Sequence, residues 1–388
     1  MTTPELVAAV VFWLCVGAMF HTYVLYPLTL QLFRRRYATP PVMPEDSWPR
    51  VAVLVPAYNE EKVIAAKIEN CLALDYPADK LEILVGSDGS KDRTNEIVRS
   101  YGDSRLHLIE LPGRSGKTGV LNRLVTETGA EIIVFSDANV MIEPAALRLL
   151  IRHFADDKVG VAGGGKYILI PAGAEAVHGE ALYGNYENRL RAKESAVGGM
   201  SGALGSLMAM RRVLYRPYAS GSTNDDTVPS IWATLGGYRN VYDPQARAFE
   251  ESGRSVNEEF RRRIRIGAGN FQTLFRYFGV LHPRCGICAY TFFSHKVLRW
   301  IFPFLMLGAL VSNLFLLSVD FYRFAMAVQV IGYGAVLLGF LLDRVGLRLP
   351  LLTALYHFVA LNMALFIGFL VYGRGITTSA WEPTARKA

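Results

Sequence analysis

Three short acidic segments carry the residues best suited to chemistry. Asp88 lies in SDGSKD, Asp137 and Asn139 lie in FSDAN, and Asp225 and Asp226 lie in STNDD. Oxygen-bearing side chains two residues apart suit a hard cation such as Mg²⁺ or Mn²⁺, and a cation there would neutralise a diphosphate leaving group. The adjacent carboxylates of the third segment could take the proton of an attacking hydroxyl group.

Each segment also has a purely structural interpretation. Asp88 is followed by glycine, as in an ordinary turn, and Asp137 could cap a helix. Asp225 and Asp226 precede an apolar helical stretch, Val228 to Leu235, where acidic residues complement the helix dipole. These alternatives weaken if all three segments meet at one site.

Basic residues are the natural partners of a phosphate group. The segment GRSGKT, residues 113–118, resembles part of a phosphate loop, but position 111, where that motif needs glycine, is leucine. Lys117 opens a predicted helix, so it either faces an anion at the helix N-terminus or is solvated. Arg262, Arg263 and Arg265 suit a pyrophosphate, although a solvated or lipid-facing surface is the alternative.

Alternating strands and helices position these residues. We predict strands at Val51 to Pro56, Leu81 to Val85, Leu106 to Leu111 and Ile132 to Phe135, with helices at Lys62 to Leu72 and Lys117 to Thr126. The pattern predicts an α/β fold with a mainly parallel sheet and flanking helices. Ligands of such sheets bind beyond the carboxyl ends of the strands, where Glu60, Asp88 and Asp137 lie. Ser255 and Glu258 form a predicted capping box for a helix through Ile266.

Apolar runs indicate a membrane protein. The chain has 388 residues and is 51% hydrophobic, with runs at Leu6 to Leu32, Val297 to Leu317, Phe324 to Leu342 and Leu351 to Val371. Each run reaches the ~20 residues that cross a bilayer. The predicted organisation is an anchor at 1–36, a sheet domain at 50–266, amphipathic interface helices at 267–296, about three transmembrane helices within 297–372 and a polar tail at 373–388.

The distribution of basic residues predicts the topology. Arg34, Arg35 and Arg36 follow the first run, which places the sheet domain in the cytoplasm of a multi-pass inner or plasma membrane protein. No cleavage pattern follows that run, so we interpret it as an anchor. His357 and Asn362 leave a re-entrant last segment as an alternative. The net charge of +7 is attributed to contacts with membrane lipids, and no motif for nucleic acid is present.

Taken in order, seven segments resemble the family 2 inverting glycosyltransferases with a GT-A fold. They are VPAYNE (55–60), SDGSKD, GKTGVLN (116–122), SDAN, LGSLMAMRR (204–212), NDD (224–226) and RRIRI (262–266). The membrane layout is similar to that of the poly-N-acetylglucosamine, chitin and hyaluronan synthases. The resemblance implies an enzyme that uses a UDP-sugar and Mg²⁺ or Mn²⁺, with either a glycan or a lipid as acceptor.

The resemblance also implies roles for individual residues. Asp226 would be the catalytic base, Asp88 would bind uridine, and Asp137 with Asn139 would hold the metal. Substrate-binding positions would be Pro56, Glu60, Asp88, Lys117, Asp137, Asp225, Arg262 and Arg265. Three departures from the family pattern are present: Asn139 replaces the second aspartate of DxD, NDD replaces TED, and RRIRI replaces QxxRW.

These departures bear on the product. The expected function is transfer of an N-acetylhexosamine or hexose to a growing cell-envelope or extracellular polysaccharide. Because the tryptophan of QxxRW would normally stack on the acceptor sugar, its absence keeps open transfer of a single sugar to a polyprenyl phosphate or ceramide-like lipid. A non-catalytic membrane component that only binds nucleotide is the third alternative.

Overall fold

Two compact units make up the chain. The computed structural model describes residues 2–32, 43–44, 47–169, 178–251, 256–347 and 349–375. One unit, here the sheet unit, comprises the described residues within Leu30–Arg254 and Phe275–Phe292; the other, the helical unit, comprises those within Met1–Thr29, Ser255–Leu274 and Phe293–Gly375. These units divide the chain differently from the predicted boundaries, because residues 255–266 belong to the helical unit.

The first half of the sheet unit is a parallel sheet. Its strands are β1 (Val51–Ala57), β2 (Leu81–Ser87), β3 (Leu106–Glu110) and β4 (Ile132–Phe135), which confirm the four predicted strands to within two residues. They pair in the order β3-β2-β1-β4, and every pair is parallel. The order reverses at β1, so the carboxyl ends of β1 and β4 flank a topological switch point, where such sheets bind ligands.

The second half makes the sheet mixed. Beyond β4 come β7 (Met208–Arg211), β6 (Val159–Leu169), β8 (Arg239–Glu251) and β5 (Val140–Ile142). Strand β7 runs antiparallel to both β4 and β6, whereas β6 and β8 are parallel with two register irregularities. The antiparallel insertion of β7 brings the segment before it, residues 203–207, to the carboxyl end of β4.

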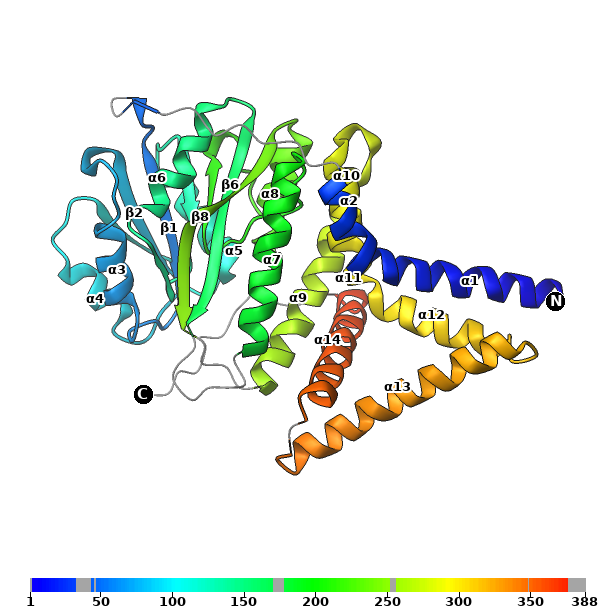
Figure 1. Cartoon of the computed structure of the whole chain (residues 1–388). Coiled ribbons are helices and arrows are strands. Elements are labelled where there is room, and N and C mark those ends of the chain that lie inside the picture. Colours follow the sequence, from blue (N-terminus) through cyan, green and yellow to red (C-terminus); the bar gives the residue numbers. More distant parts are fainter. Residues whose placement is uncertain are drawn as a thin grey trace. The chain divides into compact units, whose positions relative to one another are not determined.

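Helices cover both faces of this sheet (Figure 1). One face packs against α3 (Ile64–Leu72), α4 (Thr94–Ser100) and α6 (Ala146–Ile151) through a buried aliphatic core. The other face packs against α5 (Gly116–Thr126) and α8 (Val228–Leu235), with Trp232 1% exposed. Helix α7 (His178–Ala196) lies along β6 and β8. The predicted helices at Lys62 to Leu72 and Lys117 to Thr126 are therefore confirmed as α3 and α5.

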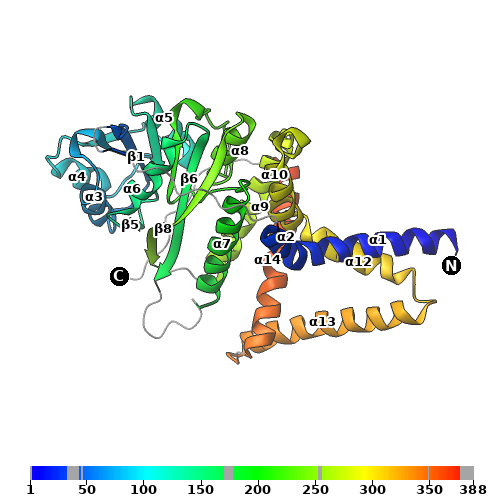
Figure 2. The ribbon, with the colours of Figure 1, turned by 45° about the horizontal axis from the view of Figure 1, so that its top comes forward.

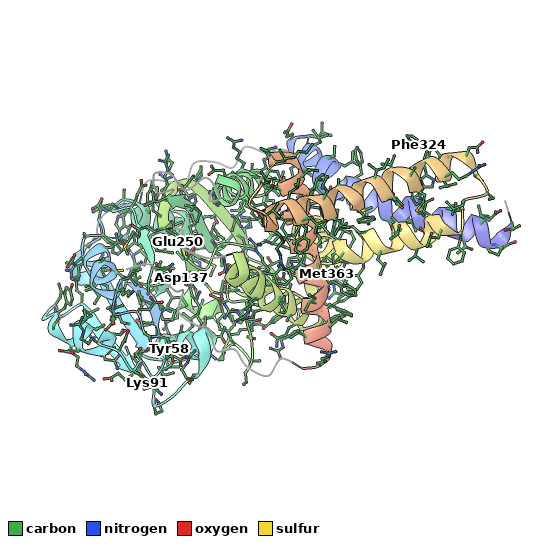
Figure 3. The ribbon with its side chains drawn as sticks, turned by 90° about the horizontal axis from the view of Figure 1, so that it is seen from below. Tyr58, Lys91, Asp137, Glu250, Phe324 and Met363 are labelled. Carbon is green, nitrogen blue, oxygen red and sulfur yellow. The ribbon has the colours of Figure 1, made fainter. Side chains whose placement is uncertain are left out.

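The helical unit contains the candidate membrane spans (Figure 2). The first comprises α1 (Thr3–Phe20), a π-helical turn (His21–Leu25) and α2 (Tyr26–Leu32), and two others are α13 (Asp320–Arg344) and α14 (Pro350–Gly373). Their apolar side chains face outward: Phe324 on α13 and Met363 on α14, labelled in Figure 3, are 70% and 50% exposed. These three helices match three of the four predicted runs.

The fourth predicted run is not one straight helix. Residues Ile287–Trp300, which include α10 (Ile287–Thr291), a π-helical turn (Phe292–Val297) and α11 (Leu298–Trp300), meet α12 (Phe302–Leu314) at a bend of 65°. Pro303 stands in the first turn of α12, where proline starts a helix but cannot continue the preceding one. The predicted span from Val297 to Leu317 is therefore broken, and the described residues contain three candidate spans, or four with this bent pair.

Helix α9 (Val256–Arg276) carries the arginine segment. It runs ten residues past the predicted end at Ile266, so no separate interface helix begins at 267. Within the helical unit it packs closely on α14, where a Cβ added to Gly368 would lie 2.8 Å from both Ile264 O and Ala268 N of α9. Ser255, Arg34, Arg35, Arg36 and the tail from 376 lie outside the described residues. The remaining short helices are Ala78–Lys80, Arg152–Ala155, Arg212–Leu214, Phe278–Leu281 and Pro283–Cys285.

Candidate active site

The loops after β1 and β2 are tied together. Asn59 has a positive φ of 51°, and its side-chain oxygen accepts a hydrogen bond from the Lys91 backbone N–H at 2.9 Å. The Glu60 N–H donates to Thr94 Oγ1 at 2.8 Å, and Pro56 pairs with Gly86 across the two strands. Asparagine tolerates this left-handed conformation better than most residues. The predicted substrate-binding residues Pro56 and Glu60 thus lie beside the SDGSKD segment.

Asp88 is completely buried and holds the start of α5. Its Oδ1 accepts from the Ser115 N–H at 2.6 Å, and its Oδ2 accepts from the Gly116 N–H and Arg114 Nε, both at 3.1 Å. The Arg114 guanidinium lies 3.4 Å from the centre of the Tyr58 ring, a close cation–π contact. Asp88 therefore joins the ends of β1 and β2 to the helix that carries Lys117.

Lys117 brings together two of the three acidic segments. Its Nζ lies 2.6 Å from Asp137 Oδ1 and 2.5 Å from Asp225 Oδ2. The three side chains are 15% to 32% exposed, so they are shielded but reachable from solvent. Asp137 follows β4 and Asp225 precedes α8. These two residues are far apart in sequence but meet at the carboxyl edge of the sheet. The expected convergence of the acidic segments is thus present for Asp137 and Asp225.

Neighbouring charges and burial act against each other in this cluster. Burial opposes the charged form of Lys117, but the nearby carboxylates of Asp137, Asp225 and Asp226 outweigh it and raise the pKa of Lys117. Burial likewise disfavours the anion of Asp137, yet Lys117 lowers the pKa of Asp137 below its usual range. Burial raises the pKa of Asp225, and the neighbouring carboxylates add to that rise against the opposing Lys117. Lys117 thus lies among three carboxyl groups, and Lys166 and Lys67 add positive charge near Asp137.

The carboxylate of Asp226 lies against the backbone of Gly205. Its Oδ1 accepts a hydrogen bond from the Gly205 N–H at 2.9 Å. A Cβ on Gly205 would lie 2.2 Å from that oxygen, which would force the Asp226 carboxylate to move, and 3.2 Å from Asp225 Oδ2, a tight contact. Glycine at 205 therefore leaves room for the Asp226 carboxylate in its present position.

Asn139 is oriented by a carboxylate from β8. Its Nδ2 donates to Glu250 Oε1 at 2.8 Å, and Lys166 on β6 forms an ion pair with the other oxygen of Glu250. Because the amide nitrogen points to Glu250, the amide oxygen, which is the only metal-ligating atom of Asn139, points away from it. Asp137 and Glu250 are labelled in Figure 3, within the sheet unit.

The donor atoms near Asp137 fit a divalent cation that arrives with a nucleotide. Asp137, Asp225 and Asp226 supply carboxylate oxygens beside Lys117, and oxygen donors suit Mg²⁺ or Mn²⁺. Among the described residues, no three His, Cys, Asp or Glu side chains form a group that could hold a metal ion by themselves. Asp137 and Asn139 would therefore supply only part of the coordination, and substrate phosphates and water the rest.

The predicted basic residues lie in different units. Lys117 belongs to the sheet unit, whereas half-buried Arg262 and exposed Arg265 lie on α9 of the helical unit, so their contact with substrate stays a prediction. Sequence reasoning singled out the LGSLMAMRR segment without giving Gly205 a role, and it missed Glu250 and Lys166 as parts of the site. Their positions depend on the pairing of β6, β7 and β8, and no local motif encodes that pairing.

The chain resembles known proteins in this region. Residues 52–217 match the family model described as Glycosyl transferase family 2. The beta-monoglucosyldiacylglycerol synthase of Synechocystis is 31% identical over 145 residues, 34% of this chain and 30% of that protein. The poly-beta-1,6-N-acetyl-D-glucosamine synthase of Staphylococcus aureus is 25% identical over 239 residues, 60% of this chain and 57% of that protein. By these alignments, the chain spans about a third to three fifths of the length of the curated relatives it matches.

One solved structure resembles nearly the whole chain. The mannosyltransferase PcManGT from Pyrobaculum calidifontis, solved in complex with GDP-Man and Mn²⁺, covers 95% of this chain at 22% identity and a TM-score of 0.70, with 98% of that protein aligned. The likeness confirms the predicted GT-A-type fold, with an α/β sheet, flanking helices and candidate membrane helices.

Proposed function

We propose that this chain, whose residues 52–217 form a glycosyl transferase family 2 domain, is a membrane-bound inverting glycosyltransferase. It would transfer an N-acetylhexosamine or hexose from a UDP-sugar to an acceptor hydroxyl group. The observation that carries the proposal is the cluster at the end of β4, where Lys117 bridges Asp137 and Asp225 next to Asp226.

The proposed chemistry is a single displacement. The acceptor oxygen attacks the anomeric carbon of the donor as the bond to the UDP oxygen breaks, so an α-linked donor gives a β-linked product. The hydroxyl proton passes to the carboxylate of Asp226, which Gly205 holds through its N–H at 2.9 Å. One base is sufficient, because no covalent sugar–enzyme intermediate is formed.

The other residues would bind the donor. Arg114 would face the nucleoside, with buried Asp88 holding Arg114 and the start of α5 in place. Lys117 would exchange its contact with Asp137 for one with the diphosphate. Asp137 and the amide oxygen of Asn139 would hold Mg²⁺ or Mn²⁺, whose charge offsets that of the leaving diphosphate. If the donor were hydrolysed at the full rate in excess chelator, the proposed requirement for Mg²⁺ or Mn²⁺ would be wrong.

Two classes of sugar acceptor, a glycan and a lipid, are compatible with the sequence. The S. aureus relative is named for a polysaccharide, which supports extension of a cell-envelope or extracellular glycan. The altered RRIRI segment, together with the Synechocystis relative named for a glycolipid, supports transfer of one sugar to a lipid. We retain the glycan as the first proposal and place the sheet unit on the cytoplasmic side of the membrane.

One experiment separates these possibilities. Membranes containing the full chain are incubated with radiolabelled UDP-sugars and with GDP-mannose, and both the consumed donor and the product size are determined. A ladder of products supports the polymerase, and a single glycolipid supports the lipid acceptor. Binding of a nucleoside diphosphate with no turnover of any donor, in the presence of both acceptor classes, would contradict an enzymatic role.

A further inference from the structure

A lysine is fully buried directly beneath the proposed metal-binding turn. Lys67 lies on α3 with 0% of its surface exposed, between the equally buried Ile64 and Ile68. Its Nζ donates to Ser136 Oγ at 2.7 Å and to the Val140 carbonyl oxygen at 2.6 Å. These contacts are short enough for charge-assisted hydrogen bonds.

The two acceptors of Lys67 bracket the turn. Strand β4 ends at Phe135 and β5 begins at Val140, so Ser136 and Val140 flank the segment that carries Asp137 and Asn139. Lys67 thus joins both ends of the turn through one nitrogen atom. Neither contact uses the carboxylate of Asp137, which pairs with Lys117, or the amide of Asn139, which donates to Glu250.

The same helix also holds the strand that follows. Asn70, three residues after Lys67, donates from Nδ2 to the Ile142 carbonyl and accepts from the Ile142 N–H, both at 2.8 Å. Residues three apart lie on the same side of a helix. Helix α3 therefore fixes β5 through Asn70 and the turn through Lys67.

A buried ammonium is costly, so its presence calls for a physical reason. Burial lowers the pKa of Lys67, whereas the Asp137 carboxylate favours the charged form. A methionine would fill the same space in the aliphatic core without that cost. Packing alone does not explain the lysine, but the two hydrogen bonds to the turn do.

We propose that Lys67 is a positioning residue that fixes the Ser136–Val140 turn, so that Asp137 and Asn139 meet the metal and diphosphate of the donor. This inference rests on the proposed function. It names a residue outside the site predicted from sequence, and it acts through the backbone and hydroxyl of the turn rather than by touching substrate. Partners behind the first ligands of a metal site typically change metal affinity or activity by about 10- to 100-fold.

The test measures how much a metal strengthens nucleotide binding. Full-length protein in detergent is titrated calorimetrically with UDP, and in parallel with GDP, once with Mn²⁺ and once with EDTA. The ratio of the two dissociation constants is the metal-dependent gain. We expect Lys67→Met to reduce this gain by about tenfold or more, with affinity in EDTA unchanged. The matched control is Ile68→Ala, which should lower the melting temperature and leave the gain at the wild-type value.

The outcomes are distinguishable. If Asp137→Ala abolishes the gain and folded Lys67→Met keeps it within about twofold of wild type, a margin of roughly 0.4 kcal/mol, the positioning role is wrong. If wild type shows no gain with either nucleotide, the metal part of the proposed function is wrong as well. Should Lys67→Met fail to fold, Ser136→Ala removes one of the two hydrogen bonds and keeps the lysine itself in place. It should reduce the gain by about fivefold, and an unchanged gain would overturn the proposal.

Discussion

Substitution of Gly205 by alanine tests the geometry of the proposed base. The added Cβ would lie 2.2 Å from Asp226 Oδ1, 3.3 Å from Asp226 Cγ and 3.2 Å from Asp225 Oδ2. Asp226 must therefore rotate away and lose its 2.9 Å hydrogen bond from the residue 205 N–H. Gly205 does not have a positive φ, so backbone strain does not contribute.

The expected effect is large on turnover and small on folding. A displacement of a reacting group by about 1 Å can cost about 100-fold, and a general base contributes about 10²- to 10⁴-fold. We therefore expect kcat for sugar transfer to fall by about 100-fold, while overpacking lowers stability by about 1–3 kcal/mol. Nucleoside diphosphate affinity should fall much less than kcat, because the atoms nearest the added Cβ belong to Asp226 and Asp225 and not to Asp88 or Arg114.

The assay is steady-state transfer by purified full-length protein, with calorimetric nucleotide binding and a thermal melt. Gly102→Ala is the matched control, because its Cβ would meet nothing within 4 Å. The double variant Gly205→Ala with Asp226→Asn should be no slower than Asp226→Asn alone, since both changes disable one base. A folded Gly205→Ala variant with kcat within about threefold of wild type would refute the reasoning, as would full additivity in the double variant.

Three further predictions concern charged side chains. Lys117→Met removes the ammonium between Asp137 and Asp225, and UDP affinity measured by calorimetry should fall by about 10-fold or more; unchanged affinity would contradict its contact with the diphosphate. Asp88→Asn removes the anionic acceptor of the α5 N-terminus, so nucleotide affinity and thermal stability should fall together; a loss of neither would leave Asp88 without a role. Buried Asp243 accepts hydrogen bonds from His153 and Arg152. Burial raises the pKa of Asp243, but these hydrogen bonds outweigh burial and lower the pKa below its usual range. Asp243→Asn should therefore reduce the free energy of unfolding, measured with denaturant, by about 3 kcal/mol. This stabilisation by Asp243 is present above the unfolded-state pKa of about 4 and is lost as pH falls toward the lower pKa of the folded state. The free energies of unfolding of wild type and variant should therefore converge in acid.

Much of the parallel half of the fold follows from local sequence patterns. Strands β1 to β4 are short apolar runs bounded by polar turns, and their order along the chain predicts that Asp88 and Asp137 follow strand ends. Convergence at one edge then follows from parallel pairing, without knowledge of any long-range contact. The bend between Trp300 and Phe302 has a cause that is visible in the sequence, Pro303. Hydropathy alone, however, does not distinguish a broken apolar segment from a straight one.

The rest of the site depends on long-range pairing. Glu250 reaches Asn139 because β8 pairs with β5 in one register, Val140 opposite Glu250, and a shift by one residue would turn that side chain to the other face. Lys67 did carry a local signal. It lies on the apolar stripe of α3, beside Ile64 and Ile68, where a solvated lysine would not be expected. Its partners, however, come from a turn about 70 residues away, and only tertiary packing brings them together.

The central claim is that Asp226 takes the proton of the acceptor. Its most direct measurement compares wild type with Asp226→Asn in transfer of sugar from the preferred nucleotide sugar, alongside binding of the corresponding nucleoside diphosphate. We predict that kcat falls by about 100-fold or more while nucleotide affinity stays within about threefold, because asparagine keeps the shape of aspartate but cannot accept a proton. Turnover by folded Asp226→Asn at the wild-type rate would contradict the claim.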